Sequence, residues 1–253
     1  MTELQKYCFG FIFVILKAMN TEQQLKFSST VFTIPFLFVF TIWLVYWIEI
    51  KFGWNFNKFG VFPRNFSGLK GVLCSPFIHS DTKHLFNNSV PLFVLSACLF
   101  YFYKEVAIKV LLFGGIITGL LTWLIARESY HIGASGIVYL LFSFVLFSGI
   151  IKKNYRLVAV SFITIFLYGS MVWYVLPIKE EMSWEGHLSG LITGIVLALL
   201  YKNKGIIKER FEFSKTEFDD MFDKNGNYIP PIVEEAELEL KEIKYRYIYK
   251  EEE

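Results

Sequence analysis

Three short segments of the chain carry side chains suited to acyl-transfer chemistry. His84 and Asn88 are four residues apart, Ser135 lies among small residues, and His187 lies in a second glycine-containing run. A spacing of four places His84 and Asn88 on one face of a helix, where they could donate hydrogen bonds to a developing oxyanion. A serine hydroxyl is a weak nucleophile at neutral pH and needs an adjacent base. The residues predict Ser135 as nucleophile, with its own amide as a further oxyanion donor, and His187 as base.

Each segment also has a simpler explanation when it is considered alone. The run Gly133-Ala134-Ser135-Gly136 fits a packing surface, because small residues let membrane helices approach closely. His187 could be a histidine satisfied at an interface, and His84 with Asn88 could mark a water-exposed helix start. Tyr139, four residues after Ser135, either braces His187 or faces lipid or a neighbouring helix.

The surroundings of His187 favour a two-residue catalytic unit. Gly190 and Gly194 follow it by three and seven residues, so they share its helix face and allow tight packing against the helix that carries the serine. Within the apolar segments, Asp and Glu occur only at the edges, as Glu49 and Glu185. We therefore expect a Ser–His dyad without a buried acidic partner.

A metal site is the competing interpretation of the histidines. His79, His84 and His187 could supply three zinc ligands, but no His-Glu-x-x-His spacing provides a carboxylate base on the same helix. We expect neither a metal nor another cofactor.

The elements that must position these residues are membrane helices. Apolar residues make up 54% of the 253-residue chain and charged residues 19%, and residues 202–253 hold 14 of the 23 Asp and Glu residues. The remainder is too apolar for a soluble enzyme or a disordered chain. It also lacks the concentrated basic excess of a nucleic-acid binder, so no nucleic acid is expected.

Six segments are long and apolar enough to cross a hydrocarbon core of about 30 Å. They are residues 31–50, 85–103, 106–126, 132–151, 157–176 and 184–201. Lys and Arg are more frequent in the segments that are cytoplasmic if the N-terminus is inside, which places both termini in the cytoplasm. In that orientation His84, Asn88, Ser135 and His187 lie near the outer face on three helices, with Ser135 about three residues into its helix.

The sequence predicts three regions. Residues 1–30 form a cytoplasmic or interfacial segment, residues 31–201 the six-span domain, and residues 202–253 a charged cytoplasmic tail. The apolar stretch 7–16 is too short to span, and an interfacial helix is preferred over a signal peptide. Residues 51–84 form a long first outer loop, half-apolar and partly embedded, and loops of that length are usually functional. The tail contains a turn at Asn225-Gly226-Asn227 and a solvated helix from Ile232 onward.

With these residues in hand, the chain resembles the rhomboid family of intramembrane serine proteases. The resemblance covers about residues 31–201, in span number, in order and in the helix that carries each residue. It rests on the following matches: Ser135 between Gly133 and Gly136, His187 followed by Gly190 and Gly194, the pair His84 and Asn88, and the approach Ser75-Pro76-Phe77-Ile78-His79. It implies an all-α membrane protein, a six-transmembrane-helix rhomboid-like bundle with a long first outer loop.

The resemblance also implies a role for each matching residue. Ser135 is the implied nucleophile, His187 the general base and then acid, and His84, Asn88 and the Ser135 amide the implied oxyanion hole. His79 is a supporting polar residue, Tyr139 packs on His187, and Gly190 and Gly194 seat the sixth helix against the fourth. The implied substrates are single-span membrane proteins in the lipid bilayer, and a bacterial inner membrane is the expected location.

The sequence departs from the family in its first outer loop. That loop contains Trp54 but lacks the Trp-Arg pair of many members, which bears on the loop's shape and not on the chemistry. The alternative function is a catalytically inactive rhomboid-like protein that binds membrane clients, although such proteins typically lack the serine or the histidine. A transporter is less compatible, since no paired half-helices are interrupted near the midplane. The sequence predicts no oligomeric state.

Overall fold

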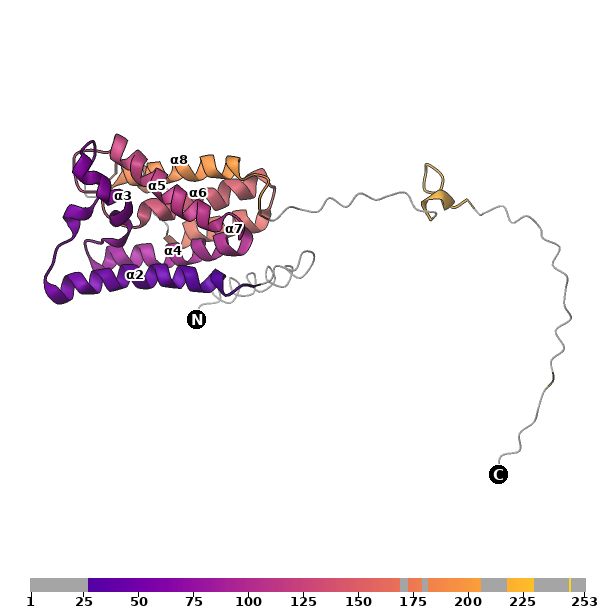
Figure 1. Ribbon diagram of the computed structural model, residues 1–253. Coiled ribbons are helices and arrows are strands. Elements are labelled where there is room, and N and C mark those ends of the chain that lie inside the picture. The colour runs from indigo at the N-terminus through magenta and orange to yellow at the C-terminus, as the bar shows by residue number, and fades with distance from the viewer. Residues whose placement is uncertain (1–26, 169–172, 179–181, 206–217, 230–245, 247–253) are drawn as a thin grey trace, which may run out of the picture. The chain divides into compact units, whose positions relative to one another are not determined.

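A computed structural model of the chain describes residues 27–168, 173–178, 182–205, 218–229 and 246. The chain divides into two units, residues 1–208 and 209–253. The larger unit is a bundle of helices that run side by side (Figure 1). Its main elements are α2 (Thr30–Phe52), α4 (Thr82–Phe102), α5 (Ala107–Ile125), α6 (Ser135–Ile151), α7 (Tyr155–Tyr168) and α8 (Trp184–Leu200).

Three of these helices, α2, α4 and α5, are long and apolar enough to cross a membrane, and α6, α7 and α8 are shorter apolar helices. They occur in the same chain order as the six predicted segments. The structure describes α7 over Tyr155–Tyr168, and near the end of the predicted segment 157–176 it describes the 3₁₀ turn η5 (Trp173–Val175). The six-span count therefore stays a prediction.

The α6 helix is the centre of the bundle. It packs against α8 most extensively and also contacts α4, α5 and α7. Almost every side chain from Ile137 to Val145 is buried, as expected for a helix that is hydrophobic on all sides. The helix that carries Ser135 is thus held by its neighbours along most of its length.

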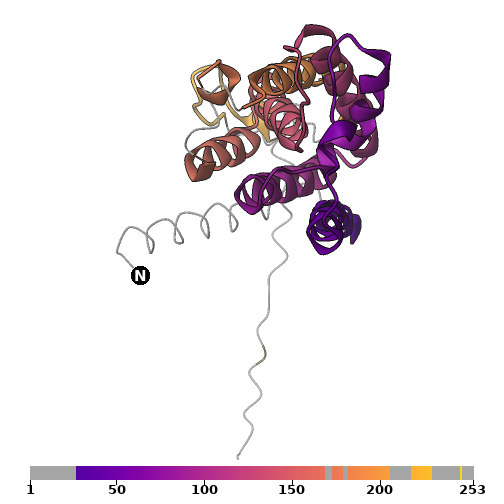
Figure 2. The same ribbon diagram turned by 90° about the vertical axis from the view of Figure 1, so that its left-hand side faces the viewer.

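The α2 helix lies at the edge of the bundle beside α4 (Figure 2). Only Val31, Pro35, Ile42 and Glu49 of this helix are buried. Large aromatic side chains, including Phe36, Phe40 and Trp47, are about half exposed. Such a surface is compatible with contact to lipid rather than water.

Between α2 and α4 the chain forms the long connection predicted for residues 51–84. It contains α3 (Gly71–Cys74) and the short 3₁₀ turns η2 (Asn57–Phe59), η3 (Phe66–Lys70) and η4 (Ser75–Phe77). Arg64 fastens this loop to the end of α5 by donating from Nη1 to the Ala126 carbonyl at 2.7 Å. Trp123 donates from its indole nitrogen to the Asn65 carbonyl at 2.9 Å. These two hydrogen bonds hold the loop against α5, although the loop lacks the Trp-Arg pair discussed above.

In the smaller unit, the structure describes one turn. Its elements are η6 (Asp219–Met221) and an antiparallel bridge between Phe222 and Tyr228. Asp223 accepts hydrogen bonds from the backbone of Asn225 and Asn227, and Gly226 has φ +82°. The predicted turn at residues 225–227 is confirmed. The predicted helices at residues 7–16 and from Ile232 onward lie outside the described residues.

Candidate active site

Ser135 and His187 are in hydrogen-bond contact at the start of α6 and α8. Ser135 Oγ lies 2.9 Å from His187 Nε2, and His187 Nδ1 lies 2.7 Å from the Tyr174 carbonyl oxygen. A carbonyl can only accept, so Nδ1 carries the proton and Nε2 is left to accept from the serine hydroxyl. This is the arrangement of a nucleophile and a base whose ring is oriented by a third group.

The imidazole is further held by an aromatic stack. The rings of Tyr139 and His187 have centroids 4.3 Å apart and are inclined by only 16°. Tyr139 comes one turn after Ser135 on α6, so the helix that supplies the hydroxyl also supports the base. His187 is 4% exposed, which leaves the ring few alternative orientations.

Glycines allow the two helices to approach this closely. A Cβ on Gly190 would collide with the carbonyl oxygen of Gly136, and a Cβ on Gly194 with Ser143 Oγ and the Leu140 carbonyl oxygen. Both glycines therefore bring the α8 backbone against the α6 backbone. The close approach is what places His187 within reach of Ser135.

The first turn of α6 begins at Ser135, not three residues inside a helix that starts at 132 as the sequence predicted. Gly133 has φ +104°, a conformation that side-chain-bearing residues rarely adopt and that interrupts the helix. Ser135 is therefore the first helical residue. Its amide has no intrahelical partner, as for every first-turn N–H.

Asn88 and His84 of α4 lie against the same glycine. A Cβ on Gly133 would meet His84 Nε2 at 2.7 Å and Asn88 Nδ2 at 3.5 Å. Asn88 is 5% exposed, and within the described parts of the chain its Nδ2 has no hydrogen-bond partner. An unpaired buried donor costs about 1–3 kcal/mol, so its presence beside the serine needs an explanation.

His84 Nε2 is not a hydrogen-bond donor while the ring is neutral. The Ser80 hydroxyl donates to Asp81 at 2.7 Å and so accepts from His84 Nδ1, 3.2 Å away. With the proton on Nδ1, His84 can donate from Nε2 only as an imidazolium cation. His79 packs edge-on against His84, with ring centroids 5.1 Å apart. Burial, and to a smaller extent the adjacent His84, lower the pKa of His79 to about 4.

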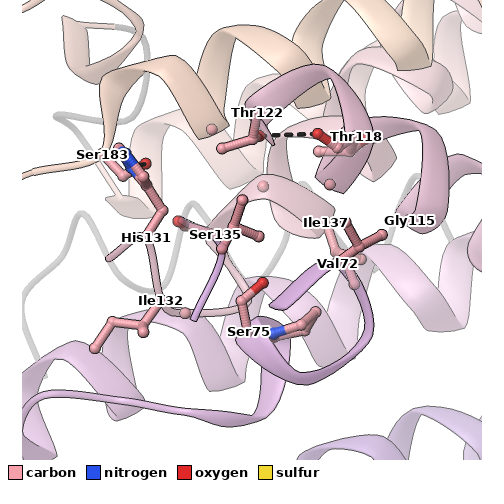
Figure 3. Close-up of a pocket in the computed structure, with 16 residues that line it drawn as sticks. Val72, Ser75, Gly115, Thr118, Thr122, His131, Ile132, Ser135, Ile137 and Ser183 are labelled. Carbon is pink, nitrogen blue, oxygen red and sulfur yellow. Dashed lines mark hydrogen bonds between the residues drawn. The ribbon is translucent and has the colours of Figure 1, made fainter. Parts of the chain in front are cut away.

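A small cavity of about 40 Å³ opens beside Ser135 (Figure 3). Residues of the long outer loop, of α5 and of the α6 start line it. Polar groups in its wall include Ser75, Thr118, Thr122 and Ser183. Thr122 donates to the Thr118 carbonyl at 2.8 Å, whereas the Thr118 hydroxyl is buried without a partner among the described residues. These threonines were not singled out from the sequence, since Ser and Thr in membrane helices commonly bond only their own backbone.

Histidines do not gather into a metal centre here. No group of three His, Cys, Asp or Glu side chains in the described ranges could hold a metal ion. The contact that orients His187 is a backbone carbonyl, for which the sequence carries no signal. Both acids at the segment edges, Glu49 and Glu185, are buried, but Glu185 pairs with Arg127 at 3.7 Å and not with His187.

Few classes of protein combine a bundle of membrane helices with a serine and a histidine that are hydrogen-bonded to each other near one end of the bundle. The Rhomboid domain family matches residues 67–204, more than half of the chain. The chain therefore belongs to the rhomboid family.

Curated relatives come from mycobacteria. Uncharacterized proteins of Mycobacterium tuberculosis and Mycobacterium bovis are 32% identical to the chain over 177 residues, which cover 64% of this chain and 72% of each relative. An uncharacterized protein of Mycobacterium leprae is 30% identical over 142 residues, covering 52% of this chain and 56% of that protein. Each of these matches thus covers more than half of this chain.

Proposed function

We propose that the protein is an intramembrane serine protease that cleaves membrane-protein substrates with a dyad of Ser135 and His187. The observation that carries this proposal is the 2.9 Å contact between Ser135 Oγ and His187 Nε2, with the opposite ring nitrogen donating to the Tyr174 carbonyl. A histidine that merely satisfied its hydrogen bonds at an interface would not need the serine of a first helical turn as its partner.

The geometry supports a two-step reaction. Ser135 Oγ attacks the carbonyl carbon of the scissile bond while its proton moves to His187 Nε2. The same nitrogen then protonates the departing amine, leaving an acyl group on Ser135. In the second step His187 takes a proton from water, which attacks the acyl carbon, and the proton returns to Ser135.

Oxyanion stabilisation is assigned to Asn88 Nδ2 and the Ser135 amide, with His84 as a further contributor when it is cationic. The buried and unpaired state of Asn88 Nδ2 supports this role, because a donor without a ground-state partner is available to the transition state alone. The remaining assignments are positional. His79 supports His84, Tyr139 stacks on His187, Gly133 and Gly136 flank the nucleophile, and Gly190 and Gly194 seat α8 against α6.

The second step requires water inside a membrane protein. The cavity beside Ser135 has about 40 Å³ and several polar wall groups, whereas one water needs roughly 10–15 Å³ and two to four polar partners. We infer that the cavity delivers the hydrolytic water to the acyl group on Ser135.

The full architecture is proposed as six spans with both termini cytoplasmic. At 1.5 Å per residue the 17-residue helices α6 and α8 are shorter than a core of about 30 Å. Of the two, α6 packs against α4, α5, α7 and α8, whereas α8 leaves Ile192 and Val196 exposed on its outer face. We infer that the outer ends of both helices open onto the polar loops that precede them. We infer that the dyad lies below the outer surface, where it would meet single-span substrates that unwind near their outer ends. The mycobacterial relatives support a bacterial inner membrane.

The proposal is tested with purified protein in detergent and a fluorescent single-span substrate. Native protein should release product, whereas Ser135→Ala and His187→Ala should not. Ser189→Ala is the matched control, because the Ser189 hydroxyl donates to the Glu185 carbonyl within α8 and does not contact the dyad. Cleavage by Ser135→Ala at the native rate would refute the proposal. Absence of turnover by the native protein, with retained substrate binding, would favour the inactive client-binding alternative.

A further inference from the structure

A second polar cluster lies beside the dyad. Two of its members, His131 and Ser183, also line the cavity, but none of its side chains takes part in a bond-making or proton-transfer step of the proposed reaction. Arg127 follows α5, His131 precedes Ser135 by four residues, and Ser183 and Glu185 begin the helix that carries His187. Figure 3 shows His131 beside Ser183, close to Ser135. We call Arg127, His131, Ser183 and Glu185 the loop clamp.

The first half of the loop clamp is an ion pair with one buried member. The Glu185 side chain is 3% exposed and that of Arg127 is 39% exposed, with 3.7 Å between Glu185 Oε1 and Arg127 Nε. The same carboxylate oxygen accepts from the Arg127 amide at 3.3 Å, and Arg127 Nη2 donates to the Met182 carbonyl at 2.7 Å. A carboxylate is rarely buried unless it is paired, and this one is paired across the gap between the two loops.

The second half is a neutral histidine with a defined proton position. His131 Nε2 lies 3.0 Å from the Arg127 carbonyl and therefore donates to it. Its Nδ1 then accepts from the Ser183 hydroxyl at 2.6 Å. Burial lowers the pKa of His131 below its usual value, so the ring is neutral at pH 7, as this pattern requires.

The loop clamp connects the two segments that supply the dyad. His131 is also tied to the long outer loop, since its amide donates to the Val61 carbonyl at 2.8 Å and its carbonyl accepts from Val61 at 2.9 Å. One side of the cluster is therefore fixed to the chain leading into Ser135, and the other side to the first turn of α8. Neither α6 nor α8 contributes a side chain to it beyond Glu185.

We propose that Arg127, His131, Ser183 and Glu185 are positioning residues that set the distance between Ser135 Oγ and His187 Nε2. This inference rests on the proposed function. The contacts of Gly190 and Gly194 hold α8 against α6 from Gly136 onward, whereas the loop clamp ties together the segments that lead into the two helices. Releasing it lets the two ends separate, and a misplacement of about 1 Å can cost about 10²-fold in rate.

The test measures how fast a fluorophosphonate probe labels Ser135 in purified full-length protein. Labelling forms an Oγ–P bond and expels fluoride, with the serine proton passing to His187, so its rate reports the dyad directly. Glu185→Ala should label about 10²-fold more slowly and lose kcat by a similar factor, with KM within twofold of native. Glu185→Gln, which keeps an oxygen acceptor for the Arg127 amide, should recover most of the rate. Glu128→Ala is the matched control, because that carboxylate lies in the same loop but is 75% exposed.

Thermal unfolding separates positioning from folding. All rates are measured at least 10 °C below the Tm of each variant. If Glu185→Ala does not fold, Ser183→Ala, which removes a single hydroxyl, is tested in its place. A folded Glu185→Ala or Ser183→Ala that labels within twofold of native would overturn the inference, as would a change confined to KM. Failure of the native protein to label would instead refute the proposed function.

Discussion

Replacing Asn88 with alanine should separate catalysis from stability. Asn88 Nδ2 is buried and has no partner in the part of the chain that the structure describes, so truncation breaks no ground-state hydrogen bond at that nitrogen. Removing an unpaired buried donor relieves a cost of about 1–3 kcal/mol, which offsets part of the packing lost with the side chain. If the nitrogen binds the oxyanion, kcat should fall by about 10²- to 10³-fold, equivalent to about 2.7–4 kcal/mol.

The assay compares kcat, KM and Tm of Asn88→Ala with those of Asn87→Ala. Asn87 is the exposed neighbour on the same helix, so it controls for the loss of an amide from this turn. We expect Asn88→Ala to lose kcat with KM and Tm nearly unchanged, and Asn87→Ala to match the native protein in all three. A kcat within threefold of native, or a Tm that falls in proportion to activity, would refute the oxyanion assignment.

Two further predictions concern packing and pH. Gly190→Ala should reduce both activity and Tm, since its Cβ would meet the Gly136 carbonyl oxygen. Overpacking typically costs about 1–3 kcal/mol. Gly115→Ala, whose Cβ would have its nearest neighbour at 3.6 Å, should keep the native Tm, and equal Tm values for the two variants would contradict this prediction. His79 has a pKa of about 4 in the folded protein, against the usual 6.5. Between pH 6.5 and pH 4 the unfolded state therefore binds one proton more than the folded state. The free energy of unfolding should fall by about 3 kcal/mol as the pH is lowered through this window. The unfolding free energy of His79→Gln should lack this loss, and an equal slope in both proteins would show that other groups cause it.

The helices could be predicted from the sequence because the bilayer imposes a length and a composition that ordinary domains do not share. Residues 85–103 and 106–126 correspond to α4 and α5 within a few residues. The start of α6 was predicted three residues early, since hydropathy continues through Ile132 while the backbone turns at Gly133. At the far end of the predicted segment 157–176, residues Trp173–Val175 form a 3₁₀ turn and not an α-helix, which hydropathy does not distinguish.

Side-chain chemistry could be predicted only for residues that lie in a recognisable local motif. His84 and Asn88 share one helix turn, and Ser135 and His187 each lie among small residues. The loop clamp is different, because Ser183 and His131 are 52 residues apart and Arg127 and Glu185 are 58 apart. Ser135 and His187 are also 52 residues apart and meet through the same packing of α6 against α8, but each lies in a recognisable motif, whereas the loop-clamp residues do not. Glu185 accordingly looked like an edge residue in the sequence although it is buried.

The Tyr174 carbonyl, which accepts the hydrogen bond from His187 Nδ1, has a consequence for how this protein could evolve and be probed. An aspartate in that place would titrate, and a single codon change could remove it. A peptide oxygen does neither: every residue type at position 174 supplies it, and no acid available to a cell protonates it. Alanine scanning would pass over the group that orients the base, and only an edit to the main chain, such as an ester in place of the following amide or a proline that redirects the turn, would expose its contribution.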